Sequence, residues 1–247
     1  MAKAPRSRLD KLVVEKGLAD SREKARRLIL AGEVLVDETP VDKPGFLVRL
    51  DAAIRFRRPR KSFVGRGGEK LRGALDSFSL DPKGLSVLDV GASTGGFTDC
   101  LLQRGAASVT ALDVGKGQLD WKLVSDPRVR AIEGVNARYL DPRDFPEPFD
   151  LATVDLSFIS LTKVLPAVVP LLKPEGAILM LVKPQFELSP SDIEKGGLVR
   201  DEKKHQKAVE SVSAAAEALG FRVAGVVPAV IRGASGNQEY FLLVRRV

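Results

Sequence analysis

The stretch at residues 85–100, LSVLDVGASTGGFTDC, constrains the fold more than any other part of this chain. Apolar residues up to Val90 predict a buried strand, the turn at 91–96 predicts a glycine-rich bend, and the residues from Phe97 onward predict a helix. Ligands of open α/β sheets bind where strands end and helices begin, so the bend is a candidate cofactor site. A plain strand-to-helix turn is the alternative.

Strands and helices alternate through most of the chain. We expect strands at 86–90, 108–113, 129–134, 151–155, 177–182, 221–230 and 240–244, and helices near 96–104, 118–125, 161–172 and 201–219. This alternation predicts an α/β fold with a mostly parallel, seven-stranded, Rossmann-like sheet that helices cover on both faces. The last two strands have no helix between them, which predicts an antiparallel hairpin at one edge.

The first quarter of the chain has a different pattern and predicts a separate small α+β domain. A helix is expected at 8–17, and a second begins near Asp20, where Asp20 and Glu23 have the spacing of a capping box. The segment RFRRPRK, residues 55–61, holds five cations and a proline, which favours a linker that contacts nucleic acid. We therefore expect domains at 1–60 and 61–247.

The net charge of +7 lies entirely in this first quarter. Residues 1–62 hold 16 Lys and Arg against 9 Asp and Glu, which leaves 23 of each sign in the rest of the chain. Arg22 and Arg26 are four residues apart and share a helix face, with Arg27 beside them. This asymmetry favours a polyanionic partner bound by the N-terminal domain; a solvated basic surface is the alternative.

Composition argues against several other classes of protein. Cys100 is the only cysteine, which excludes an intramolecular disulfide, and His205 is the only histidine. These counts argue against a zinc site and against a Ser-His or Cys-His nucleophile system unless His205 serves. We expect no bound metal. The sequence has no apolar run of membrane-spanning length and no signal peptide core, so we expect a cytoplasmic protein.

The glycine-rich bend narrows the choice of cofactor. Ser93 stands where a dinucleotide-binding motif needs its second glycine, so a pyrophosphate is disfavoured. Asp113 ends the next strand 22 residues after Gly91, where an acidic residue binds ribose hydroxyls in nucleoside-binding folds. An adenosyl group without a pyrophosphate fits both observations.

The segment DVGASTGGF resembles the S-adenosylmethionine motif of class I methyltransferases. The resemblance implies S-adenosylmethionine as the cofactor. It implies that the cofactor-binding residues are Asp89, Gly91, Ala92, Ser93, Thr94, Gly95, Gly96, Phe97, Asp113, Asn136 and Asp155. For Asn136 a polar cap at a strand end is an equal alternative.

Four charged residues stand at informative positions: Lys70, Asp155, Lys183 and Glu239. Lys70 follows the glycine-rich loop at 64–68, which either binds an anion or acts as a hinge between domains. The other three stand at predicted strand ends, and together the four resemble the Lys-Asp-Lys-Glu catalytic tetrad of FtsJ-like RNA ribose methyltransferases. By that resemblance Lys183 removes the proton of a ribose hydroxyl or orients its oxygen. Two ordinary ion pairs at strand ends are the alternative.

Two wider resemblances cover nearly the whole chain. RLDKLVVEKGLADSREKARRLILAGEVLVDETPVDKPG resembles the S4 RNA-binding domain, and the segments RGG-x-KL, VDLSFISL and VKPQFE resemble the TlyA hemolysin family. They imply a Rossmann-like class I methyltransferase, preceded by an RNA-binding domain, that methylates the ribose 2′-hydroxyl of a cytidine in ribosomal RNA within a ribosomal subunit. The expected RNA-binding residues are Arg8, Arg22, Arg26, Arg27, Arg58, Arg60, Lys61 and Arg66. A non-catalytic RNA- or ribosome-binding protein and a membrane-lytic hemolysin are the alternatives.

Overall fold

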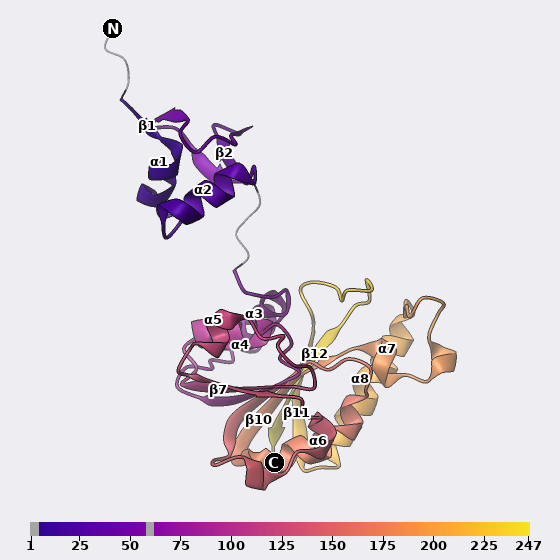
Figure 1. The fold of residues 1–247 in the computed structure, drawn as a ribbon. Coiled ribbons are helices and arrows are strands. Elements are labelled where there is room, and N and C mark those ends of the chain that lie inside the picture. The colour runs from indigo at the N-terminus through magenta and orange to yellow at the C-terminus, as the bar shows by residue number, and fades with distance from the viewer. Residues whose placement is uncertain (1–4, 58–61) are drawn as a thin grey trace. The chain divides into compact units, whose positions relative to one another are not determined.

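The computed structural model describes residues 5–57 and 62–247 (Figure 1). The described residues form two compact units, which divide between Lys61 and Ser62. Arg58, Arg60 and Lys61, three of the expected RNA-binding residues, lie outside the described residues.

The N-terminal unit packs two helices against short antiparallel strands. Its elements are β1 (Arg6–Arg8), α1 (Leu9–Glu15), α2 (Arg22–Leu30), β2 (Val34–Val36), β3 (Thr39–Pro40), β4 (Leu47–Arg49) and β5 (Ile54–Phe56). Strand β1 pairs with β4, and β2 pairs with both β3 and β5. Buried apolar side chains such as Leu9, Ile29 and Val34 form the core of this unit.

Two local expectations for this unit were wrong. The cap of α2 is Ser21, whose Oγ accepts a hydrogen bond from the backbone N–H of Lys24 at 3.2 Å. Asp20 lies one residue before this N-cap position and instead forms an ion pair with Lys24. Arg55 and Phe56 belong to β5 and not to the linker, because their backbone groups pair with β2.

The C-terminal unit is built on one seven-stranded sheet. Its strands are β6 (Ser86–Val90), β7 (Ser108–Asp113), β8 (Val129–Glu133), β9 (Phe149–Val154), β10 (Leu172–Val182), β11 (Phe221–Pro228) and β12 (Tyr240–Arg246). The spatial order is β11-β12-β10-β9-β6-β7-β8, and β12 runs antiparallel to both of its neighbours. The predicted α/β class, the mostly parallel sheet and the edge hairpin are therefore confirmed.

Helices cover both faces of this sheet (Figure 1). The helices of this unit are α3 (Gly67–Phe78), α4 (Gly96–Gln103), α5 (Trp121–Val124), α6 (Leu165–Val168), α7 (Pro184–Glu187) and α8 (Glu202–Glu217), with short 3₁₀ turns between several of them. Side chains alternate along the strands. Leu179 and Leu181 pack on the face of α3 and α4, whereas Ile178 and Met180 pack on the face of α6 and α8.

Two predicted helices are shorter than the sequence pattern indicates. The expected helix at 161–172 is broken into a 3₁₀ turn (Leu161–Lys163), α6 and a second 3₁₀ turn (Val169–Leu171). Pro166 and Pro170 lack the N–H that a continuous helix needs, which accounts for the breaks. Only four residues of the expected helix at 118–125 are helical, because Asp120 caps α5.

Candidate active site

Four charged side chains from distant segments line one pocket of about 350 Å³. Lys70 lies on α3, Asp155 follows β9, Lys183 follows β10 and Glu239 precedes β12. The residues form two ion pairs, Lys183 Nζ to Asp155 Oδ1 at 2.5 Å and Lys70 Nζ to Glu239 Oε2 at 2.5 Å. The four residues singled out in the sequence are thus brought together as ion pairs, and these pairs form the wall of a pocket.

Strand topology explains why these residues meet. Strands β9 and β10 are parallel neighbours, so Asp155 and Lys183 emerge at the same edge of the sheet. Strand β12 is antiparallel to β10 and its first residue, Tyr240, pairs with Val182. This register places Glu239 beside Lys183, although the two are 56 residues apart in the sequence.

Of the residues that line this pocket, Glu239 and Lys183 are buried, whereas Ser157 and Phe158 are exposed. Glu239 is 3% exposed and Lys183 9%, and each carboxylate has a lysine partner, so the four charges sum to zero. The backbone of Gly233 lies against Glu239, where a Cβ would come within 2.3 Å of Oε1. Lys183 Nζ also donates a hydrogen bond to Ser157 Oγ at 3.0 Å. This second contact holds Nζ toward the loop that follows β9.

A second pocket, of about 550 Å³, adjoins the first. The two share Gly91, Ser93, Asp155, Ser157 and Phe158, so they form one continuous cleft along the edge of the sheet. Apolar side chains line much of the second pocket: Leu112, Val114, Val135, Leu156, Ile159 and Val164. Asp113, Gln118 and Asn136 supply its polar groups.

The glycine-rich turn at 91–96 lines both pockets, since Gly91 and Ser93 belong to each of them. Asp113 supports it, since its carboxylate accepts hydrogen bonds from the N–H groups of Ser93 and Gly115, each at 2.7 Å. Gly91 has φ +86°, and a Cβ there would lie 2.2 Å from the carbonyl oxygen of Asp155. Only glycine can occupy this position without moving the backbone of the adjacent strand end.

Most of the expected cofactor residues line the cleft. These are Gly91, Ala92, Ser93, Thr94, Gly96, Phe97, Asp113, Asn136 and Asp155. Asp89 and Gly95 line neither pocket. The side chain of Asn136 also caps a 3₁₀ turn, because its Oδ1 accepts from the N–H of Arg138 at 3.0 Å. Asn136 therefore has the capping role that was the alternative and also lines the second pocket.

Asp89 lies beneath the turn and is fully buried. Its carboxylate accepts hydrogen bonds from Thr98 Oγ1 at 2.6 Å and Thr153 Oγ1 at 3.0 Å. Burial raises the pKa of Asp89 to about 6, and the two hydroxyls oppose this shift. Asp89 thus joins β6 to α4 and β9 and does not contact the space in the cleft.

The sequence left Ser157, Phe158, Gln185 and Phe186 without a role, yet all four line the first pocket. Phe158 is 90% exposed, has φ +66°, and its ring centroid lies 5.1 Å from that of Phe186. Large apolar side chains rarely combine such exposure with a left-handed backbone. In the sequence, the signal that could have indicated this role was Phe158, an aromatic residue that stands between Ser157 and Ser160 and closely follows Asp155.

The residues of the cleft fit a nucleoside with a short charged chain. The apolar walls of the second pocket suit a purine ring, and the carboxylate of Asp113 retains lone pairs that can accept hydrogen bonds from ribose hydroxyls. Gly96 lets the start of α4 approach the segment at 65–68 closely, since a Cβ on Gly96 would come within 2.9 Å of the Gly68 nitrogen. The donor set therefore fits S-adenosylmethionine.

The N-terminal unit carries arginines in two distinct settings. Arg8 and Arg22 both form ion pairs with the buried carboxylate of Asp10, at 3.0 and 3.1 Å. Arg26 and Arg27 are exposed and form no ion pair with any residue that the structure describes. In the C-terminal unit, Arg66 is exposed and lines the first pocket.

Asp10 is expected to make the N-terminal unit sensitive to acid. The hydrogen bond from Arg8 lowers the pKa of Asp10 to about 2. Stability from this carboxylate is therefore present above about pH 4 and lost as the pH falls toward 2. Asp10→Asn should lower the free energy of unfolding of this unit at pH 7 by about 1–3 kcal/mol, with less effect at pH 2. Urea unfolding followed by NMR signals of α1 and α2 measures this, and equal losses at both pH values would contradict it.

Two further classes of feature are absent from the residues described. None of their helices is both long and apolar enough to cross a bilayer. Within 5–57 and 62–247, no three His, Cys, Asp or Glu side chains gather in a way that could hold a metal ion.

Comparison with known proteins identifies both units. The family model of FtsJ-like methyltransferases matches residues 63–246, and that of the S4 domain matches residues 7–54. The 16S/23S rRNA (cytidine-2′-O)-methyltransferase TlyA of Mycobacterium tuberculosis is 45% identical over 243 residues, which cover 98% of this chain and 91% of that protein.

Two other relatives carry the name hemolysin. Hemolysin A of Brachyspira hyodysenteriae is 39% identical over 94% of this chain and 97% of its own length. A solved structure from Streptococcus thermophilus, also named as a hemolysin, has a TM-score of 0.75 and 40% identity, and covers 99% of this chain and 90% of its own. The chain belongs to the FtsJ-like methyltransferases and, among them, to the TlyA family, in which an S4 domain precedes the methyltransferase domain.

Proposed function

We propose that this protein transfers a methyl group from S-adenosylmethionine to the ribose 2′-hydroxyl of a cytidine in ribosomal RNA within a ribosomal subunit. One observation carries the proposal: the Lys70-Asp155-Lys183-Glu239 tetrad lines a pocket continuous with one that fits a nucleoside. The relative from M. tuberculosis is named for the same reaction. Since ribosomal subunits are the proposed substrate, we also propose that the protein acts in the cytoplasm.

The second pocket is the proposed donor site. When bound, S-adenosylmethionine supplies an electrophilic methyl group on a positively charged sulfur. Three groups that line the cleft would hold it: Asp113 would accept hydrogen bonds from the ribose hydroxyls, Asn136 would hold the adenine ring, and the turn at 91–96 would hold the methionine portion. Asp89 lies outside both pockets and joins β6, the strand before the turn, to α4 and β9.

The first pocket is the proposed acceptor site. Lys183 Nζ contacts the acceptor hydroxyl and either orients its oxygen or removes its proton, while Asp155 and Ser157 hold Nζ in place. The pair of Lys70 and Glu239 closes the opposite wall. The exposed ring of Phe158 offers a surface on which the base of the acceptor nucleotide stacks.

Basic residues of both units are the proposed contacts to the RNA backbone. Arg26 and Arg27 present free guanidinium groups, and Asp10 holds those of Arg8 and Arg22 in fixed positions. Arg66 stands at the acceptor pocket, where it would bind a phosphate beside the target nucleotide. Arg58, Arg60 and Lys61 remain proposed contacts from the sequence alone.

Transfer of a labelled methyl group tests this function. The protein is incubated with labelled S-adenosylmethionine and, in separate reactions, with ribosomal subunits, free ribosomal RNA and transfer RNA. We expect label in ribosomal RNA, and most of it when the RNA is presented in subunits. Tight binding of subunits without any incorporation would instead support the non-catalytic alternative.

Gly91→Ala is expected to abolish donor binding. The new Cβ would lie 2.2 Å from the Asp155 carbonyl oxygen, and the turn would have to move out of the donor pocket. The affinity for S-adenosylmethionine, measured by calorimetry, should fall by at least about a hundredfold, as expected for loss of several fixed contacts. Gly84→Ala is the matched control, because φ is +75° there but a Cβ would meet no atom within 4 Å. Similar losses in the two variants would contradict the role of Gly91.

A further inference from the structure

Glu187 cross-links two of the segments that line the acceptor pocket. It is the last residue of α7, four residues after Lys183, and lines neither pocket. Its Oε2 accepts a hydrogen bond from Ser160 Oγ at 2.5 Å, and its Oε1 accepts one from the Leu161 N–H at 2.9 Å. One partly buried carboxylate thus ties the segment after β10 to the segment after β9.

The loop at 155–160 is therefore held at both of its ends. At its start, the N–H of Asp155 donates to the Val90 carbonyl at 2.9 Å, which continues the sheet. At its end, Ser160 and Leu161 are bound to Glu187. Phe158 lies between these anchors with φ +66°, a conformation that a bulky side chain keeps only where its surroundings hold the backbone.

We propose that Glu187 is a positioning residue for methyl transfer: it holds the loop at 155–160 so that Ser157 fixes Lys183 and Phe158 faces the acceptor nucleotide. The inference rests on the proposed function and extends it to a residue outside the tetrad. Glu187 acts through Ser160 and Leu161 and does not itself contact substrate or donor.

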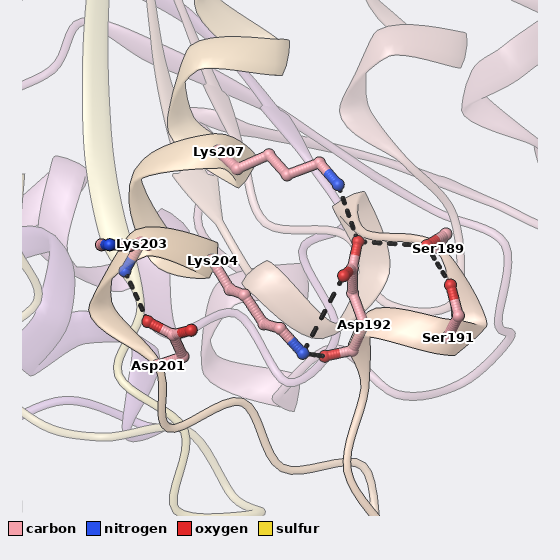
Figure 2. Close-up of polar contacts among 7 residues, drawn as sticks. All are labelled: Ser189, Ser191, Asp192, Asp201, Lys203, Lys204 and Lys207. Carbon is pink, nitrogen blue, oxygen red and sulfur yellow. Dashed lines mark hydrogen bonds and ion pairs between the residues drawn. The ribbon is translucent and has the colours of Figure 1, made fainter.

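A second anchor of the same segment offers a control. Beyond α7, Asp192 accepts from Lys207 Nζ at 2.8 Å and from Ser189 Oγ at 3.1 Å, and its backbone carbonyl accepts from Lys204 Nζ at 2.6 Å (Figure 2). These contacts pin the segment to the first turns of α8. None of these contacts involves the loop at 155–160, so Asp192→Asn should weaken only the attachment of this segment to α8.

Steady-state methyl transfer to ribosomal subunits, together with calorimetry of S-adenosylmethionine binding, tests the proposal. For Glu187→Ala we expect kcat/KM for RNA to fall by about tenfold or more, and the Kd of the donor to change by less than about threefold. Glu187→Gln should restore most of the activity, because its amide oxygen can still accept from the Leu161 N–H. Ser160→Ala removes one of the two bonds and should give an intermediate loss, which provides a readout if Glu187→Ala fails to fold.

Several outcomes would overturn the proposal. These are full activity of Glu187→Ala or of Ser160→Ala, an equal loss in Asp192→Asn, or a loss of donor affinity as large as the loss in kcat/KM. If the proposed methyl transfer to ribosomal RNA is wrong, the wild-type protein will transfer no methyl group to that RNA, and the role of Glu187 is then overturned as well. Active wild-type protein with an unaffected Glu187→Ala variant overturns the role of Glu187 alone.

Discussion

Lys183→Ala is expected to lower kcat for methyl transfer by about 10²- to 10⁴-fold, the range for loss of a positioned acid-base group. The Kd of S-adenosylmethionine should change by no more than a few-fold, because Lys183 lines the acceptor pocket and not the donor pocket. Single-turnover transfer to ribosomal subunits and donor calorimetry measure the two quantities. Lys183→Arg separates the two possible roles. A guanidinium keeps the positive charge and can orient the hydroxyl, but it stays protonated and therefore cannot accept the hydroxyl proton.

Lys173→Ala is the matched control for this prediction. Lys173 lies at the opposite end of the same strand, β10, and forms an ion pair with Asp150 at 2.6 Å. Loss of that pair should leave kcat unchanged. Equal turnover by Lys183→Ala and the wild type, or equal loss in the Lys173 control, would contradict the assigned role.

Removal of two free arginines should weaken RNA binding and flatten its salt dependence. Arg26 and Arg27 are exposed and share the α2 region of the N-terminal unit, so Arg26→Gln/Arg27→Gln should remove about two phosphate contacts. The slope of log K against log salt should become less steep by about 2, and affinity near physiological salt should fall by about tenfold or more. Filter binding across a series of salt concentrations measures both.

A control with the same change in net charge separates position from total charge. Arg128 and Arg143 lie in the C-terminal unit, in ion pairs with Asp126 and Asp141. Arg128→Gln/Arg143→Gln should leave the salt slope unchanged. A slope that falls equally in both double variants would show that net charge alone governs binding, and would contradict a specific arginine surface on the N-terminal unit.

Periodicity predicted the sheet well because each strand has a strong local signal. The apolar run that ends at Val90 and the alternation of the later strands set both type and order, and β6 and β7 have the expected bounds. Helix lengths were predicted less well. The pattern at 161–172 is apolar enough for a helix, but Pro166 and Pro170 divide it into short turns.

The tetrad was predictable since its members stand at the ends of elements. The carboxyl ends of parallel strands meet at one edge, and the antiparallel β12 brings Glu239 back to that edge. The pairing within the tetrad was not predictable, because any of its lysines could reach either carboxylate until the register was known. The structure pairs Lys183 with Asp155 and Lys70 with Glu239.

Residues that act through others left little signal in the sequence. Asp89 belongs to the motif and was expected to contact the cofactor, but its side chain points from β6 into the core toward Thr98 and Thr153. Strand direction alone does not say which of two successive side chains faces a ligand. Glu187 and Ser160 are 27 residues apart, and only the packing of α7 against the loop after β9 brings them together.

The position of the transferred methyl group tests the central claim most directly. Ribosomal subunits are methylated with labelled S-adenosylmethionine, and the RNA is hydrolysed in alkali, which cleaves each linkage through the free 2′-hydroxyl beside it. The proposed reaction predicts label in an alkali-resistant dinucleotide that begins with 2′-O-methylcytidine, because the methylated oxygen cannot attack the neighbouring phosphate. Label released in mononucleotides would place the methyl group on a base and contradict ribose methylation by the tetrad.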